Sequence, residues 1–150
     1  TFRLFRPFRL FRPMIRPETR RRARAFQLLY AWETQGRPPL DDLVRGFARM
    51  VRPGPVLLEE SVALAHGVTE RIDQLDQTIA LAAEHWRFER IGLTERLVLR
   101  IAAFELLQGA TPPRVAIDQA LWLAHRFAGA SAVPFVNGIL DRVAREMGRL

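Results

Sequence analysis

Four arginines stand within five positions, in the segment RRRAR at residues 20–24. The planar guanidinium fork of arginine donates two parallel hydrogen bonds to one phosphate, and free amides at a helix start add donors for the same anion. Cations at that end of a helix are otherwise disfavoured by the helix dipole, by roughly 0.3 to 1 kcal/mol each. The cluster therefore predicts contact with a phosphate backbone through Arg20, Arg21, Arg22 and Arg24.

The positive charge of the chain lies almost entirely at its N-terminal end. The first 24 residues hold nine arginines and one acid, Glu18, whereas the rest of the chain holds the other 14 of 23 basic residues and 15 of 16 acids. A basic arm on a nearly neutral body is typical of proteins that bind nucleic acid. The charge alone leaves a second interpretation open, a tail that only keeps the protein in solution.

Side chains for catalysis or metal binding follow no usable pattern. His66, His85 and His125 have no metal-ligand spacing, and the chain has no cysteine. It also lacks a phosphate-binding glycine loop and a nucleophilic-serine motif. The apolar runs are far shorter than the roughly 20 residues that cross a bilayer. The sequence thus predicts a soluble, cytoplasmic protein with no membrane partner, no enzymatic activity, no metal site and no cofactor.

Helical periodicity runs through the sequence from Glu18 onward, and no segment shows the sustained alternation of a strand. Proline and glycine interrupt the apolar patterns and mark the connections. We therefore expect an all-α protein, a compact bundle of about seven helices near residues 18–35, 40–50, 56–70, 73–86, 94–108, 114–128 and 133–147.

Some features of these helices make specific predictions. The first helix is expected to face water through one stripe, formed by Arg20, Arg24, Gln27 and Ala31. We expect Asp73 and Thr94 to be the N-caps of the fourth and fifth helices. The fifth helix is apolar almost all round, which is typical of the central helix of a bundle.

The hexapeptide FRLFRP occurs twice in succession at residues 2–13. Its prolines prevent a continuous helix, so we expect residues 1–15 to be a disordered N-terminal extension. A perfect duplicate of six residues is typical of a short tandem duplication of DNA, and we expect Met14, directly after it, to be the true start of the protein. The rival interpretation is an arm whose phenylalanines and arginines follow a single strand of RNA by stacking and charge.

Four blocks of sequence, taken in order, resemble the NusB family of bacterial transcription antitermination factors. They are RRRARAFQLLYAWE at 20–33, LTERLVLRIAAFELL at 93–107, VAIDQALWLAHRF at 115–127 and FVNGILDRV at 135–143. The resemblance implies an all-α, NusB-like domain over residues 16–150, built from two three-helix halves. It also implies a factor that binds boxA-type single-stranded RNA with the ribosomal protein NusE. In the RNA polymerase elongation complex, such a factor supports transcription of ribosomal RNA operons.

The resemblance assigns roles to particular residues. The arginines of the first block match the family's RNA-contacting helix start, and Phe135 and Asn137 match the FVNG block at the RNA face. Tyr30 and Glu95 match positions at or near the NusE interface. Taken alone, these residue types leave a core role for Phe135 open, and they leave capping or a close helix approach open for Asn137 and Gly138.

Two places depart from the family's pattern. The loop at 129–134 reads GASAVP where the family is usually polar and charged, so contacts from Ser131 to Pro134 stay open. Trp122 stands where the family commonly has a glutamate, on the polar side of its helix. We expect its indole to be partly exposed, as a partner contact or as packing against a neighbouring helix.

Two other function classes remain as alternatives. A similar helical domain begins ribosomal RNA cytosine methyltransferases, but such an enzyme also needs an α/β cofactor domain, for which these residues offer no candidate. A helical module that only contacts other proteins would show no salt-dependent affinity for RNA.

Overall fold

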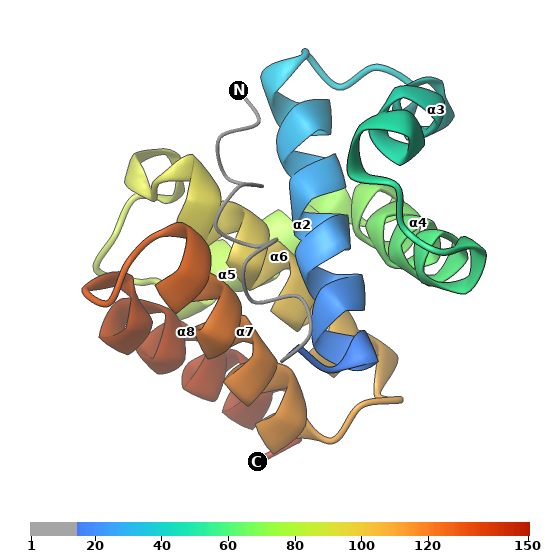
Figure 1. The fold of residues 1–150 in the computed structure, drawn as a ribbon. Coiled ribbons are helices and arrows are strands. Elements are labelled where there is room, and N and C mark those ends of the chain that lie inside the picture. The colour runs from blue at the N-terminus through green and yellow to red at the C-terminus, as the bar shows by residue number, and fades with distance from the viewer. Residues whose placement is uncertain (1–14) are drawn as a thin grey trace. The chain divides into compact units, whose positions relative to one another are not determined.

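The computed structural model describes residues 15–150, and the chain divides into two compact units, one ending at Ala65 and one running from His66 to Leu150. The described residues form seven α-helices and one short 3-10 helix (Figure 1). The expected all-α fold of about seven helices is confirmed. The FRLFRP repeat and the rest of the expected extension up to Met14 lie outside the described residues.

The first unit contains α2 (Pro17–Thr34), α3 (Leu40–Val51) and the first part of α4 (Pro55–Glu70). Pro17 begins α2 at a position where a missing N–H costs nothing, and Glu18 in the first turn favours the helix dipole. Helix α2 packs against α3. Its large apolar side chains are buried, and Phe26 and Leu29 are completely so. The first helix thus begins and ends within one residue of the expected positions.

A tight turn ends α2. Gly36 has φ 83° and Arg37 has φ 60°, both in the left-handed region. The Arg37 side chain donates to both carboxylate oxygens of Glu33, at 2.6 and 3.0 Å, and its guanidinium lies 4.9 Å from the Trp32 ring centre. These contacts hold Arg37 in a conformation that residues other than glycine seldom adopt.

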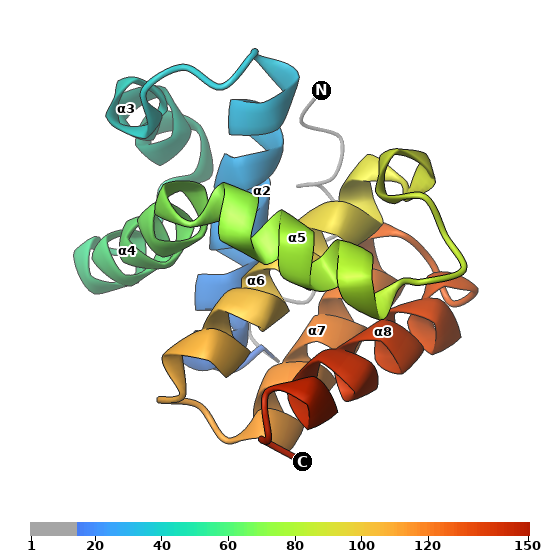
Figure 2. The ribbon, with the colours of Figure 1, turned by 180° about the vertical axis from the view of Figure 1, so that it is seen from behind.

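The second unit contains the end of α4 and four complete helices, one more than the three expected for each half. They are α5 (Ile72–Ala82), α6 (Leu93–Gln108), α7 (Pro113–Phe127) and α8 (Ala132–Glu146), with the 3-10 helix η3 (Phe88–Arg90) before α6. Helix α6 packs against α5, α7 and α8, and α8 also packs against α5 and α7 (Figure 2). Every residue from Leu97 to Leu106 is buried, so α6 is the central helix of this unit, as expected.

The start of α6 differs from the expected one. Gly92, not Thr94, is the N-cap, and it has no side chain to bind the first amides. The carboxylate of Glu95 folds back over Gly92, so closely that a Cβ at residue 92 would overlap Oε2. A glutamate three residues after the cap, turned back to the helix start, is one half of a capping box. Glu95 therefore places a negative charge where the helix dipole favours it.

Helix α5 also differs at both ends. Its N-cap is Arg71, and Asp73, the expected cap, lies in the first turn. It ends at Ala82 instead of continuing to Trp86, because Ala83 has ψ 48° and leaves the helical region. Beyond Ala83, Glu84 and Trp86 contact Arg142 and Phe135 of α8. The apolar periodicity of α5 cannot predict such contacts with a distant helix.

A partly buried ion pair joins α5 to α6. Arg100 is 1% exposed, and its Nε and Nη2 donate to Oδ1 and Oδ2 of Asp76 at 2.7 and 2.9 Å. The same guanidinium lies 5.8 Å from the ring centre of Phe88 in η3. Two parallel hydrogen bonds give this pair a fixed geometry. The pair thus holds α5, α6 and η3 together next to the segment that contains Trp86.

Candidate nucleic-acid interface

The four predicted arginines of α2 differ in accessibility. Arg20 and Arg21 are partly exposed, whereas Arg22 and Arg24 are 2% and 4% exposed. Arg22 donates from Nη1 to the carbonyl of Glu18 at 3.1 Å, which ties its side chain to the helix start. A phosphate approaching from solvent is therefore reached most directly by Arg20 and Arg21.

The stripe of α2 that was expected to face water is largely covered. Arg24, Gln27 and Ala31 are all at most 7% exposed, so this expectation is wrong for three of its four members. Arg24 Nη1 donates to Gln27 Oε1 at 2.9 Å, which pairs two of the buried polar groups. Periodicity identifies the most polar side of a helix, but it does not record whether another segment covers that side.

The backbone amides at the start of α2 are mostly engaged. Pro17 has no N–H, and the amides of Thr19 and Arg20 both donate to the carbonyl of Arg16 at 3.0 Å. Among the described residues, this leaves the amide of Glu18 as the one first-turn donor for an anion. The expected set of free amides is therefore wrong, and phosphate binding here depends on guanidinium groups.

Tyr30, a predicted partner residue, is partly exposed on the same helix. Its ring centre lies 6.4 Å from that of the buried Phe26. Ten residues of helix separate Tyr30 from Arg20, which is about 15 Å along the axis. The predicted partner residue and the predicted phosphate contacts thus lie at different points along α2.

A cavity of about 330 Å³ in the second unit brings two predicted residues together. We call it the aromatic cavity, and it is lined by Trp86, Arg90, Ile91, Gly92, Glu95, Ser131, Ala132 and Phe135. Glu95 is expected at the protein partner and Phe135 at the RNA, yet both border the same cavity. Phe135 is only partly buried, so a purely core role does not describe it.

Trp86 completes the aromatic side of this cavity. Its side chain is 59% exposed, and its ring meets that of Phe135 in a T-shaped contact, with centres 5.3 Å apart and an interplanar angle of 82°. The sequence pattern places Trp86 at a helix end and does not single it out. Its neighbours His85 and Arg87 do not distinguish it, because Leu75 also stands between two polar residues and is fully buried.

The segment before Trp86 is held on α8 by an ion pair. Glu84 accepts a hydrogen bond from Arg142, which also donates from Nε to Glu146 at 3.2 Å. The hydrogen bond from Arg142 holds the pKa of the Glu84 carboxyl below its ordinary value, and acceptance by Glu84 raises the pKa of Arg142. Both side chains are exposed to solvent, so the pair contributes more to geometry than to stability.

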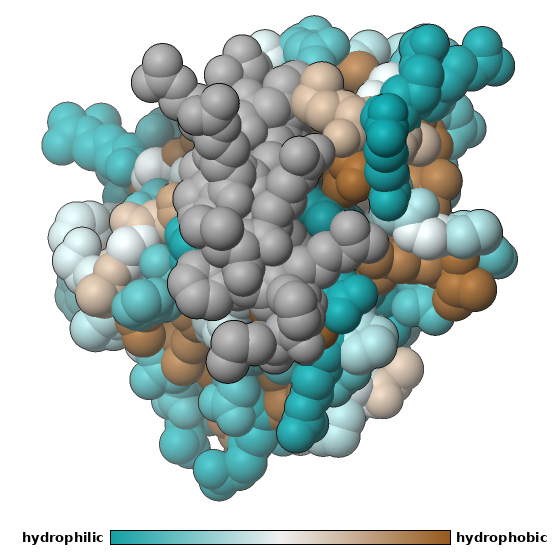
Figure 3. Space-filling model, in the orientation of Figure 1, coloured by the Kyte–Doolittle hydropathy of each residue, from teal (hydrophilic) through white to brown (hydrophobic). Residues whose placement is uncertain are grey.

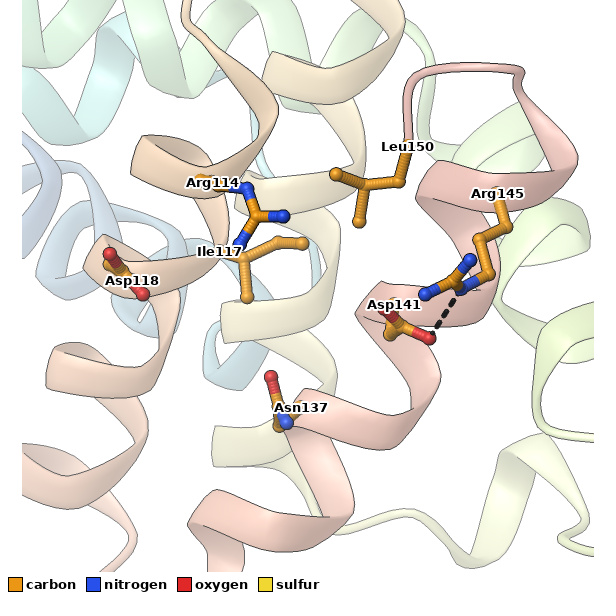
Figure 4. A pocket seen from close by; sticks show the side chains of 7 residues that line it. All are labelled: Arg114, Ile117, Asp118, Asn137, Asp141, Arg145 and Leu150. Carbon is orange, nitrogen blue, oxygen red and sulfur yellow. Dashed lines mark hydrogen bonds and ion pairs between the residues drawn. The ribbon is translucent and has the colours of Figure 1, made fainter.

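Asn137 lines a different cavity. This polar cavity has a volume of about 400 Å³, and its lining comes from α7, α8 and the C-terminus: Arg114, Ile117, Asp118, Asn137, Asp141, Arg145 and Leu150 (Figure 4). Arg145 Nε donates to Asp141 Oδ2 at 2.9 Å, as the dashed line in Figure 4 marks. Two arginines and two aspartates leave the lining with no net formal charge, so it offers phosphate no general attraction.

The FVNG block thus presents its two predicted RNA residues to different cavities. Phe135 and Asn137 are two positions apart on α8, so their side chains point about 160° apart around the helix axis. Gly138 follows on the exposed side, and a Cβ there would meet no atom within 4 Å. The suggested close helix approach at Gly138 is therefore wrong.

Exposed apolar side chains elsewhere are scattered. Trp122 on α7 is partly exposed, as expected, and its partner role stays a prediction. The visible face in Figure 3 is largely hydrophilic outside the grey atoms, with hydrophobic residues in between.

Within residues 15–150 we find no group of three acidic or histidine side chains placed to hold a metal ion. The helices of that range include none with the length and apolar character of a membrane span.

The chain is similar to known proteins over most of its length. The model of the NusB family matches residues 19–145. A transcription antitermination protein NusB from Solibacter usitatus is 38% identical over 130 residues, covering 85% of this chain and 88% of that protein. A protein of the same name from Desulfovibrio desulfuricans is 39% identical over 134 residues, covering 82% of this chain and 81% of that protein.

Solved structures have the same fold. The structure of T. maritima NusB matches with a TM-score of 0.78 at 30% identity, covering 87% of this chain and 92% of that one. A chain from a crystal structure of the antitermination factors NusB and NusE in complex with dsRNA matches with a TM-score of 0.78 at 24% identity, covering 88% and 98%. Since the family model spans most of the described residues and the relatives agree with it, the chain belongs to the NusB family.

Proposed function

We propose that this protein is a transcription antitermination factor that binds boxA-type single-stranded RNA together with the ribosomal protein NusE. It supports transcription of ribosomal RNA operons as part of the RNA polymerase elongation complex, in the cytoplasm. It binds RNA and NusE and catalyses no reaction. The observation that supports this proposal most strongly is the family match over residues 19–145, which includes the arginine cluster and the FVNG block.

The RNA contacts are proposed for both units. Arg20 and Arg21, which are partly exposed, pair with phosphates, and Arg22 and Arg24 hold the helix start from buried positions. In the second unit Phe135 offers an aromatic ring to a base, and the exposed amide of Asn137 offers both a donor and an acceptor. Guanidinium groups supply affinity for any RNA, whereas a ring and an amide can distinguish one sequence from another.

The contacts with NusE are proposed for Tyr30, Glu95 and Trp122. All three side chains are partly exposed, so each can lose further surface when a partner binds. A tyrosine and a tryptophan are common anchors of protein interfaces, and a carboxylate such as Glu95 favours a basic partner residue. The relatives named as transcription antitermination proteins and the structure that contains both NusB and NusE support this assignment.

Equilibrium binding of labelled RNA tests the proposal. The titrations use boxA RNA, a scrambled strand of the same composition and a duplex, each at two salt concentrations. The duplex is included because one structure of this fold contains dsRNA. The proposal expects the boxA strand to bind tightest and its affinity to fall with salt. Equal affinity for boxA and scrambled strands would reduce the protein to a nonspecific RNA binder.

A further inference from the structure

We infer that the aromatic cavity receives one unstacked base of the bound RNA, with the exposed indole of Trp86 as its stacking surface. This inference rests on the proposed function and extends it. It assigns base contact to a residue outside the motifs that define the resemblance. Four observations carry it: the exposure of the indole, its anchoring, the mostly apolar lining and the charge around the cavity.

The indole of Trp86 has the surface that a base needs. It is 59% exposed, although aromatic side chains of this size usually lose most of their surface on folding. Its T-shaped contact with Phe135 uses only part of the two rings and leaves the remaining indole surface open. Proteins recognise single-stranded RNA by stacking splayed bases on aromatic side chains of this kind.

The indole is also held in place before any ligand binds. Two residues upstream, Glu84 pairs with Arg142 of α8. The amide of Trp86 donates to the carbonyl of Ala83 at 2.8 Å, which forms a turn, and its ring rests against Phe135 of the same helix α8. A surface that is already ordered loses less conformational entropy on binding.

The charges beside the cavity fit a nucleotide better than an apolar peptide. Arg87 lies directly before η3 and Arg90 is its last residue, and both are exposed. Arg90 and Glu95 line the cavity, so the lining itself carries no net formal charge, and Arg87 adds one positive charge next to Trp86 in the chain. Neither guanidinium has an ion pair or a hydrogen bond within the described residues, in contrast to Arg100, which is paired with Asp76. A nucleotide supplies a base for the apolar lining and a phosphate for these arginines, whereas an apolar side chain of a protein would leave them without an anion.

The test measures RNA binding by the full chain without NusE. The variants are Trp86→Ala, which removes the ring, and Trp86→Phe, which keeps a stacking surface. Leu107→Ala is the matched control, because Leu107 is a partly exposed large apolar residue at the other end of α6, about 18 Å along the axis from Glu95. Each protein is titrated with boxA RNA at several salt concentrations, and with a set of strands that each lack one base.

We expect Trp86→Ala to weaken RNA binding by on the order of tenfold, and Trp86→Phe to retain most of the affinity. The salt dependence should stay unchanged, because stacking releases no counterions. For one strand of the set, removal of the base should weaken binding to the wild-type protein by the same factor as Trp86→Ala weakens binding of intact RNA. Trp86→Ala should bind that strand and intact RNA with equal affinity, since the missing base and the missing indole remove the same contact.

Three results would overturn the inference. In the first, wild-type protein binds RNA and Trp86→Ala binds it equally well, which leaves the proposed function intact. In the second, a parallel titration of the same variants with NusE in place of RNA shows that Trp86→Ala loses affinity for NusE alone, which makes the cavity a protein site. In the third, wild-type protein binds no RNA, and the proposed function fails together with the inference.

Discussion

Replacing Gly67 by alanine tests how closely α4 approaches α6 within the second unit. A Cβ added at Gly67 would overlap the ring of Phe104 at Cζ, Cε1 and Cε2. Phe104 is 7% exposed, and the guanidinium of Arg71 lies 5.9 Å from its ring centre, so the ring has little room to move away. Gly67 is thus a position where the absence of a side chain is required by packing.

Two opposing effects set the magnitude. Alanine in place of glycine inside a helix stabilises by about 1 kcal/mol, and forcing extra atoms into a packed core costs typically about 1 to 3 kcal/mol. Gly67→Ala is therefore expected to destabilise the protein by up to about 2 kcal/mol. Gly138→Ala is the matched control in α8, where a Cβ meets no atom within 4 Å, and it should stabilise by about 1 kcal/mol.

Urea unfolding of the wild-type protein and both variants measures these differences. The gap between the two variants isolates the overlap with Phe104, because the gain in helix propensity is common to both. Phe104→Leu in the Gly67→Ala background should recover part of the loss, since the smaller side chain leaves room for the methyl group. A Gly67→Ala variant as stable as Gly138→Ala would show that the two helices do not meet there.

Three further predictions concern charged side chains. Alanine at both Arg20 and Arg21 should lower the magnitude of the slope of log K against log salt by roughly 1.4, because each phosphate contact to a single strand adds about 0.7. In an NMR titration, Glu84 should show a pKa below its ordinary 4.5, because Arg142 donates a hydrogen bond to it. The contribution of the Glu84 carboxylate to stability is therefore complete above pH 4.5 and is lost as the pH falls through the lowered pKa. Arg142→Ala should return the titration midpoint of Glu84 towards 4.5. Glu95→Lys should weaken NusE binding by more than about 1 kcal/mol in calorimetry, because a carboxylate at this position favours a basic partner residue.

The two binding predictions each have a control in the chain. Alanine at Arg45 and Arg49, exposed on α3, removes the same charge and should leave the salt slope unchanged. Glu59→Lys makes the charge change of Glu95→Lys on the exposed side of α4, and should leave NusE affinity unchanged. Equal effects from the controls would mean that net charge, not a local contact, is responsible. A wild-type Glu84 midpoint at 4.5 would contradict its ion pair with Arg142.

Local patterns in the sequence predict most of the fold. The apolar circumference from Leu97 to Leu106 identifies the central helix, because a helix that is apolar all round has no side that can face water. Gly109, with φ 80°, ends that helix where expected, since glycine adopts the left-handed conformation without steric cost. These features depend on residues close together in the chain, which is why they can be read without a structure.

The helix caps were missed at the local level, whereas the missed ion pairs depend on residues far apart in the chain. Arg100 and Asp76 are 24 positions apart, and Glu84 and Arg142 are 58 apart, so no local pattern links them. Trp86 is positioned by contacts with α8, through its own ring against Phe135 and through the pair of Glu84 with Arg142. The resemblance assigns Phe135 to the RNA, but only the fold shows that it borders a cavity together with Trp86 and Glu95.

The coupling between RNA and NusE on this protein is the sharpest test of the proposed function. The measurement is the affinity for boxA RNA and for the scrambled strand, each with and without saturating NusE. The account predicts that NusE tightens boxA binding by about tenfold and, because linkage is reciprocal, that boxA RNA tightens NusE binding by the same factor. Identical affinities for the two strands in the presence of NusE would contradict the account, even if both strands bound tightly.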